Sequence, residues 1–116
     1  MNLQEYLLTC LSEECSEVQL AISKANRFGL LDGYPGTNRT NQGDLIKEFN
    51  DLLGVIEVLK ETGILNIIAD RKLIDLKKDK VKEFMIYSIK RGTLQIDENK
   101  FIISSVENIL NEIGKH

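Results

Sequence analysis

The chain has 116 residues, a formal net charge of −3 and 42% hydrophobic residues. These values are typical of one ordinary domain with a buried core, and no apolar run approaches the roughly 20 residues that span a bilayer, so we expect no membrane partner. The acidic balance and the aromatic content of 6% argue against a protein that binds nucleic-acid polymers. The N-terminus has no pattern of a signal peptide, so we expect a cytoplasmic location.

The first predicted element is one long helix over residues 2–28, which contains no glycine or proline and ends at Gly29. Its apolar positions recur at helical spacing: Leu3, Leu7, Leu11, Val18, Ile22 and Ala25. Cys10 and Cys15 lie in the same segment, where we expect two reduced, buried thiols.

A long loop follows over residues 29–43, which hold four of the eight glycines and the only proline. A loop of this length in a small domain is often functional. We expect Asp44 to cap the next helix, which runs to Glu61 or Thr62 and ends at Gly63. Its apolar stripe consists of Leu45, Phe49, Leu52, Ile56 and Leu59.

The rest of the chain predicts two further helices. Residues 63–69 form either a turn of helix or a packed loop, and a third helix starts near Asp70 and runs to Lys90, with Gly92 as its stop. Five of its side chains are expected to face inward: Leu73, Leu76, Val81, Phe84 and Met85. Residues 93–96 show a short run of strand-like alternation, and a last helix covers roughly 98–113.

These elements predict an all-α fold, a helical bundle of about four helices in which the long helices are antiparallel. We expect a single domain over residues 1–116, with 94–116 as an added C-terminal segment. Two long helices with one or two shorter ones give a thin core at this size, so we expect oligomerisation to complete the bundle.

Acidic residues interrupt the apolar stripe of the first helix. Glu14 falls inside the stripe between Leu11 and Val18, Glu17 lies at its edge, and Glu13 lies further out. A carboxylate that faces a core is costly unless it is paired or binds a metal, and residues 1–23 contain no Lys or Arg. The ordinary alternatives are a solvated helix face and pairing with a basic residue from elsewhere in the chain.

Glu48 and Asp51 form a second acidic pair, at the margin of the stripe of the second long helix. Residues at i and i+3 project to the same side of a helix, so two such pairs on facing helices bring four carboxylates to one point. An all-carboxylate set suits Mg²⁺ or Mn²⁺. A di-iron bundle would need Glu-x-x-His ligands, and the only histidine is the last residue, His116.

The pattern Glu13-Glu14-x-x-Glu17 followed by Glu48-x-x-Asp51 resembles the signature of MazG-like proteins, in the superfamily of all-α nucleoside triphosphate pyrophosphohydrolases. The strings at 23–29, 48–53 and 78–94 are similar to a compact subgroup of that family. The resemblance spans roughly residues 5–94, and the paired motif is more specific than either half.

The resemblance implies hydrolysis of a nucleoside triphosphate, with a deoxynucleotide as the expected substrate, to the monophosphate and pyrophosphate. It implies four Mg²⁺ ligands, Glu14, Glu17, Glu48 and Asp51, with Mn²⁺ as an alternative ion. Glu13 and Glu14 form the implied catalytic group, in which Glu13 either lies outside the ligand set or orients the attacking water. The family also implies a homodimer or homotetramer with the nucleotide pocket near the subunit interface.

Several basic and polar residues are candidates for substrate binding. Lys24 and Arg27 follow the first acidic motif and are candidates for phosphate contact, although ordinary surface charges explain them equally well. Lys78 and Lys82, at i and i+4, either reach triphosphate oxygens or belong to a solvated helix face. Asn50 is a candidate for a hydrogen bond to the sugar or base. Weaker candidates are Arg39 and, for stacking on a base, Tyr34 and Tyr87.

Two other functions fit the same sequence. One is a phosphoribosyl-ATP pyrophosphatase-like enzyme of the same superfamily. The other is a non-catalytic helical interaction module that keeps the fold without the chemistry.

Overall fold

The computed structural model of the chain describes residues 1–96, 107–109 and 111. These residues form helices and connections, with no strand beyond a single bridge between Gly33 and Thr40, which confirms the all-α class. The chain divides into two compact units, Met1–Ile68 and Ala69–His116. The expected single domain over residues 1–116 stays a prediction.

Helix α1 spans Leu3–Phe28, as the apolar spacing predicts. The side-chain oxygen of Asn2 accepts a hydrogen bond from the backbone N–H of Glu5 at 2.8 Å and so caps the first turn. Gly29 ends the helix at φ 100°, a backbone conformation that glycine adopts without steric cost, and its N–H donates to the carbonyl of Ala25.

Helix α2 spans Asn41–Glu61 and ends at Thr62 and Gly63, as expected. Its cap is Thr40, whose side-chain oxygen accepts from the N–H of Gly43 at 3.0 Å, so the expected cap at Asp44 is wrong. The reason is that Asp44 already lies in the first turn of the helix, where its carboxylate pairs with Arg39. Thr40 has the extended backbone that an N-cap requires.

The loop between α1 and α2 is fastened at its base by the first residues of α2. The N–H of Asn41 donates to the carbonyl of Asp32 at 2.7 Å, and the buried side-chain amide of Asn41 donates to the carbonyl of Gly29 at 2.9 Å. Gly33 lies so close to Arg39 that a Cβ atom would stand 1.6 Å from its carbonyl oxygen. Only glycine fits there, because any side chain would overlap this backbone oxygen.

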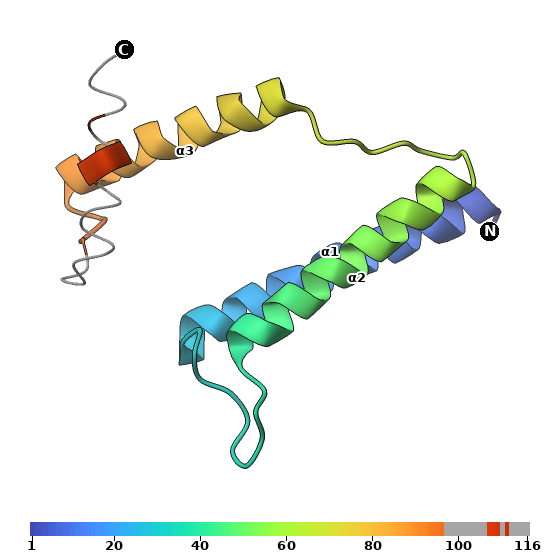
Figure 1. Cartoon of the computed structure of the whole chain (residues 1–116), viewed down its shortest axis with the longest axis horizontal. Helices are drawn as coiled ribbons and strands as arrows, with labels where there is room; N and C mark the ends of the chain where they lie inside the picture. Colours follow the sequence, from blue (N-terminus) through green and yellow to red (C-terminus); the bar gives the residue numbers. More distant parts are fainter. Residues whose placement is uncertain (97–106, 110, 112–116) are drawn as a thin grey trace. The chain divides into compact units, whose positions relative to one another are not determined.

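Helices α1 and α2 lie side by side and antiparallel, and the loop projects from one end of the pair (Figure 1). Their shared core consists of Leu7, Ala21, Ala25 and Leu59. Ile22 and Phe49 were expected in this core, but each is 50% exposed. A pair of helices buries one stripe of each, and Ala21 rather than Ile22 lies on that stripe.

Helix α3 spans Arg71–Arg91 in the second unit, with Asp70 as its cap and Gly92 as its stop, as the sequence predicts. None of its residues is fully buried, and of the five apolar residues expected to face inward only Met85 is half-buried. A helix face is buried only where another element covers it. The exposed members of that set are Leu73, Leu76, Val81 and Phe84.

Outside α1, α2 and α3, two described segments of the chain are irregular. Residues 65–70 are an irregular connection rather than a turn of helix, and residues 93–96 form no strand. Residues 107–109 and 111 are helical, while the rest of the expected last helix lies outside the described residues.

Both cysteines are free, but Cys15 is exposed and Cys10 only half-buried, so the expected burial of the thiols is wrong.

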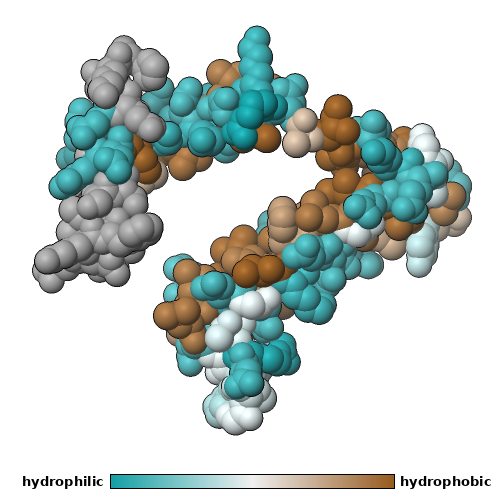
Figure 2. All heavy atoms as spheres, viewed as in Figure 1, coloured by the Kyte–Doolittle hydropathy of each residue, from teal (hydrophilic) through white to brown (hydrophobic). Residues whose placement is uncertain are grey.

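Large apolar side chains reach the surface of both units (Figure 2). Examples are Ile22 on α1, Phe49 on α2 and Phe84 on α3. No helix in the described part of the chain is both long enough and apolar enough to cross a membrane.

Candidate functional site

Three carboxylates meet between the two long helices. Glu14 comes from α1, and Glu48 and Asp51 come from α2, where their i, i+3 spacing places them one turn apart on one side. One carboxylate oxygen of each lies within 4.8 Å of one oxygen of each of the others. The side chains of Glu48 and Asp51 are 21% and 41% exposed, so the group lies at the rim of the helix interface.

Lys47 neutralises part of this negative charge. Its ammonium nitrogen lies 2.7 Å from Asp51 Oδ2 and 3.8 Å from Glu48 Oε1. The hydrogen bond with Asp51, and then the charges of Asp51, Glu48 and Glu14, raise the pKa of Lys47 above its usual value. Pairing with a basic residue from elsewhere in the chain was the ordinary alternative for the acids of α1, whereas the ion pairs of Lys47 are with its own neighbours on α2, Glu48 and Asp51.

Lys47 is not among the residues that the acidic motifs indicate, although its position in the sequence is informative. Lys47 directly precedes Glu48 and stands at i, i+4 from Asp51, the separation at which opposite charges meet on a helix. Its exposed, flexible stem leaves the ammonium free to be displaced by another cation, because no burial holds it against Asp51.

The donor set of Glu14, Glu48 and Asp51 fits a hard divalent cation. Carboxylate oxygens are the ligands that Mg²⁺ and Mn²⁺ prefer, and no soft sulfur or imidazole ligand stands in this group. Three negative charges within a few ångströms exceed the single positive charge of Lys47. The excess favours binding of a cation from solution.

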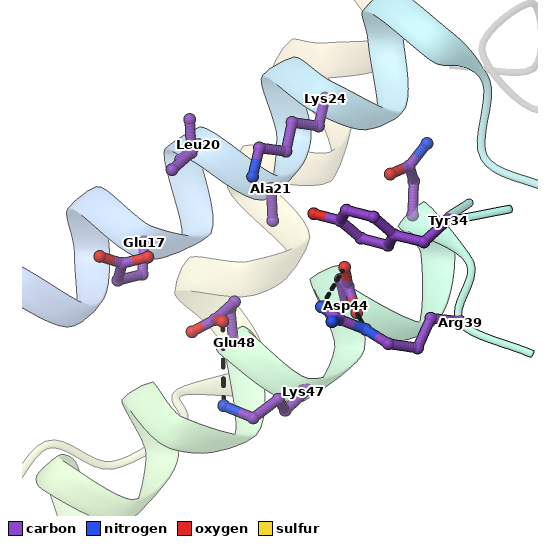
Figure 3. Close-up of a pocket in the computed structure, with 10 residues that line it drawn as sticks. Glu17, Leu20, Ala21, Lys24, Tyr34, Arg39, Asp44, Lys47 and Glu48 are labelled. Atoms are coloured by element: carbon purple, nitrogen blue, oxygen red, sulfur yellow. Dashed lines mark hydrogen bonds and ion pairs between the residues drawn. The ribbon is translucent and has the colours of Figure 1, made fainter. Parts of the chain in front are cut away.

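Glu17, the fourth predicted ligand, lies beside this cluster rather than in it. It is exposed on α1 and lines an adjacent hollow of about 170 Å³, which Glu48 lines from α2 (Figure 3). Glu13 is exposed on the surface of α1. The structure therefore brings three of the four predicted ligands together, and the ligand role of Glu17 stays a prediction.

The hollow next to the carboxylates contains positive groups as well as acids. Lys24 reaches it from α1, and Arg39 reaches it from the loop (Figure 3). The guanidinium of Arg39 bonds both carboxylate oxygens of Asp44, at 3.4 and 3.1 Å, and lies 4.5 Å from the ring centre of Tyr34. An anion whose charge is spread over several oxygens could thus contact a bound cation and Lys24 at once.

The other substrate-binding candidates are not among the residues that line this hollow. Arg27 lies over the ring of Phe28 at 4.8 Å, and the side-chain amide of Asn50 donates to the carbonyl of Ile46 within α2. Lys78 and Lys82 lie on α3 in the second unit, where they line an apolar hollow. The binding roles of all four residues stay predictions.

Comparison with protein-family models, with curated proteins and with solved structures finds no match for this chain. The resemblance to MazG-like proteins therefore stays an expectation from its motifs. What supports a function is the chain's own geometry, namely the carboxylate cluster and the polar hollow beside it.

Proposed function

We propose that the chain is a Mg²⁺-dependent nucleoside triphosphate pyrophosphohydrolase that releases a nucleoside monophosphate and pyrophosphate. The observation that carries the proposal is the convergence of Glu14, Glu48 and Asp51 from two antiparallel helices, beside a hollow that Lys24 also lines. The acidic motifs that resemble the MazG-like signature contribute all three carboxylates.

Each residue of the site has a role in this proposal. Glu14, Glu48 and Asp51 hold the cation, with Glu17 next to them at the edge of the hollow. Mg²⁺, when bound, supplies the positive charge that the phosphate oxygens need during cleavage. Lys24 binds a phosphate oxygen, and Glu13 orients the attacking water or accepts its proton.

The direct test is a reaction with Mg²⁺ and each of the four deoxynucleoside triphosphates, with products separated by anion-exchange chromatography. The monophosphate and pyrophosphate are expected. Release of a diphosphate and orthophosphate would overturn the position of cleavage. Adding phosphoribosyl-ATP to the panel distinguishes the related activity, because that enzyme cleaves the same bond in a modified nucleotide.

A matched pair of variants tests the site. Glu48→Gln removes one charge from the cluster while keeping the side-chain shape, so its activity should fall at least about 100-fold, the scale of losing one group that stabilises charge at the reacting phosphate. Glu57→Gln makes the same change on the exposed surface of α2 and should keep full activity. Equal activities of the two variants would exclude the carboxylate cluster as the site.

A non-catalytic helical interaction module is the second candidate. Two observations favour it: Lys47 already pairs with Asp51 and Glu48, and large apolar side chains are exposed on both units. A module of this kind needs no Mg²⁺, whereas a protein that binds Mg²⁺ in its native state gains stability from it. No rise in melting temperature at millimolar Mg²⁺, together with no hydrolysis, would support the module.

A further inference from the structure

Two hollows adjoin along the end of α1 and share three of their lining residues, Lys24, Tyr34 and Asn41. The first, of about 170 Å³, extends to Glu17 and Glu48 beside the carboxylate cluster. The second, of about 230 Å³, extends to Phe28, Asp32 and Gly33 under the loop. Together they form one trough with an acidic end and an aromatic end, and Lys24 stands between the ends.

The length of this trough suits a nucleotide better than a free phosphate. Glu17, Lys24 and Phe28 lie on the same helix, and the eleven-residue step from Glu17 to Phe28 corresponds to about 16 Å at 1.5 Å per residue. A triphosphate at the acidic end would therefore leave its sugar and base pointing along α1 toward the loop.

The aromatic end has the character of a stacking site. The side chains of Phe28 and Tyr34 line the second hollow and remain 55% and 44% exposed. A guanidinium lies over each ring, Arg27 over Phe28 at 4.8 Å and Arg39 over Tyr34 at 4.5 Å. Exposed rings held in this way can stack on a planar base.

Asp32 adds a polar group to the same hollow. Its backbone N–H donates to the carbonyl of Gly29 and its carbonyl accepts from Asn41, so the residue is fixed in the loop. Among the described residues, no hydrogen bond or ion pair engages its carboxylate. An ionised carboxylate only accepts hydrogen bonds, so it favours a base edge that presents N–H donors.

We propose that the hollow lined by Phe28, Asp32 and Tyr34 is the nucleobase subsite, which determines the specificity of the enzyme proposed above and rests on that function. The two oxygens of Asp32 match the two adjacent donors of guanine, its ring N–H and its amino group, whereas thymine presents one N–H between two carbonyls. Guanine nucleotides are therefore the preferred substrates.

Calorimetric titration with dGMP and with dTMP, in the presence of Mg²⁺, tests the subsite without requiring turnover. The wild-type chain should bind dGMP more tightly than dTMP. Tyr34→Leu should weaken the binding of both nucleotides about 10-fold, the scale of a lost base–aromatic contact. Tyr6→Leu changes an exposed tyrosine on α1 that lines neither hollow, so it should leave both affinities unchanged.

Asp32→Asn is the second variant. It alters one exposed side chain without changing its shape, so the fold should persist. Far-UV circular dichroism can verify this. The variant should remove the preference for dGMP over dTMP. If hydrolysis is absent but these changes in affinity occur, the subsite stands and the proposed reaction fails. If hydrolysis depends on Glu48 while neither variant changes the affinity for dGMP, or if the wild-type chain prefers dTMP, the subsite is wrong.

Discussion

At the scale of single residues, charge balance governs the candidate site. Glu14, Glu48 and Asp51 place three carboxylates within 4.8 Å of one another, and Lys47 forms ion pairs with Glu48 and Asp51. Without a cation, the carboxylates repel one another more than one ammonium can offset. A divalent cation among them would attract all three carboxylates. Binding of Mg²⁺ should therefore raise the free energy of unfolding of the chain.

Replacing Glu14 should therefore have opposite effects with and without metal. Glu14→Gln relieves repulsion, so it should raise the free energy of unfolding by about 0.5 kcal/mol in the absence of divalent cations. It should also reduce the rise in melting temperature caused by Mg²⁺, because a ligand is lost. Urea unfolding and thermal melts measure the two effects, with Glu57→Gln as the control. A variant that is less stable without metal and equally stabilised by Mg²⁺ would contradict the metal site.

Lys47 and a bound cation compete for the same carboxylate oxygens. Lys47→Gln removes the competing positive charge and keeps a polar side chain that is one carbon shorter, so the affinity for Mg²⁺ should increase several-fold. Isothermal titration with Mg²⁺ alone measures this change. Lys60→Gln, on the last turn of the same helix, is the control for the loss of a positive charge. A lower Mg²⁺ affinity in Lys47→Gln than in the control would mean that Lys47 supports the cation instead of competing with it.

At the scale of elements, short local signals fix the ends of the helices. Thr40 caps α2 through its hydroxyl, whereas Asp44 pairs with Arg39 on the surface. Thr40→Val keeps the shape and removes the acceptor, so it should lower the free energy of unfolding by about 1 kcal/mol. Asp44→Asn should cost less, because an exposed ion pair contributes little. Chemical denaturation of both variants measures the difference, and the reverse order would restore Asp44 as the cap.

At the scale of the whole molecule, exposed apolar side chains favour self-association. Ile22, Phe49 and Phe84 are large, apolar and at least half exposed, although the sequence pattern assigned all three to a core. Large apolar side chains that a single chain leaves exposed are often covered by a partner. The chain by itself buries one stripe each of α1 and α2, so the expected homodimer or homotetramer would cover what remains.

We therefore predict a mass of at least twice 13.2 kDa in sedimentation equilibrium. Phe49→Lys places a charge on this surface and should shift the distribution toward the monomer. Leu31→Lys makes a similar change in the loop, at an apolar residue that is more exposed than Phe49, and should leave the distribution unchanged. A wild-type chain that sediments at 13.2 kDa at micromolar concentration would contradict self-association.

The sequence by itself determined the helices and most of their ends. Helix α1 followed from an uninterrupted apolar spacing, and Gly29, Gly63 and Gly92 stop helices where the chain needs a positive φ. These features depend on local backbone preferences, which a linear pattern records directly. The position of Glu48 and Asp51 on one side of α2 has an equally local cause, because residues at i and i+3 are neighbours on the surface of any helix.

Only the tertiary structure decided which faces are buried and which charges meet. The sequence placed Ile22 and Phe49 in the core, yet the packing of two helices alone selects the narrower stripe that contains Ala21 and Leu59. It is also the docking of α1 on α2 that brings Glu14 to Glu48, and the fastened loop that brings Arg39 and Tyr34 beside Lys24. Contacts between residues far apart in the chain depend on helix rotation and loop path, which no local pattern specifies.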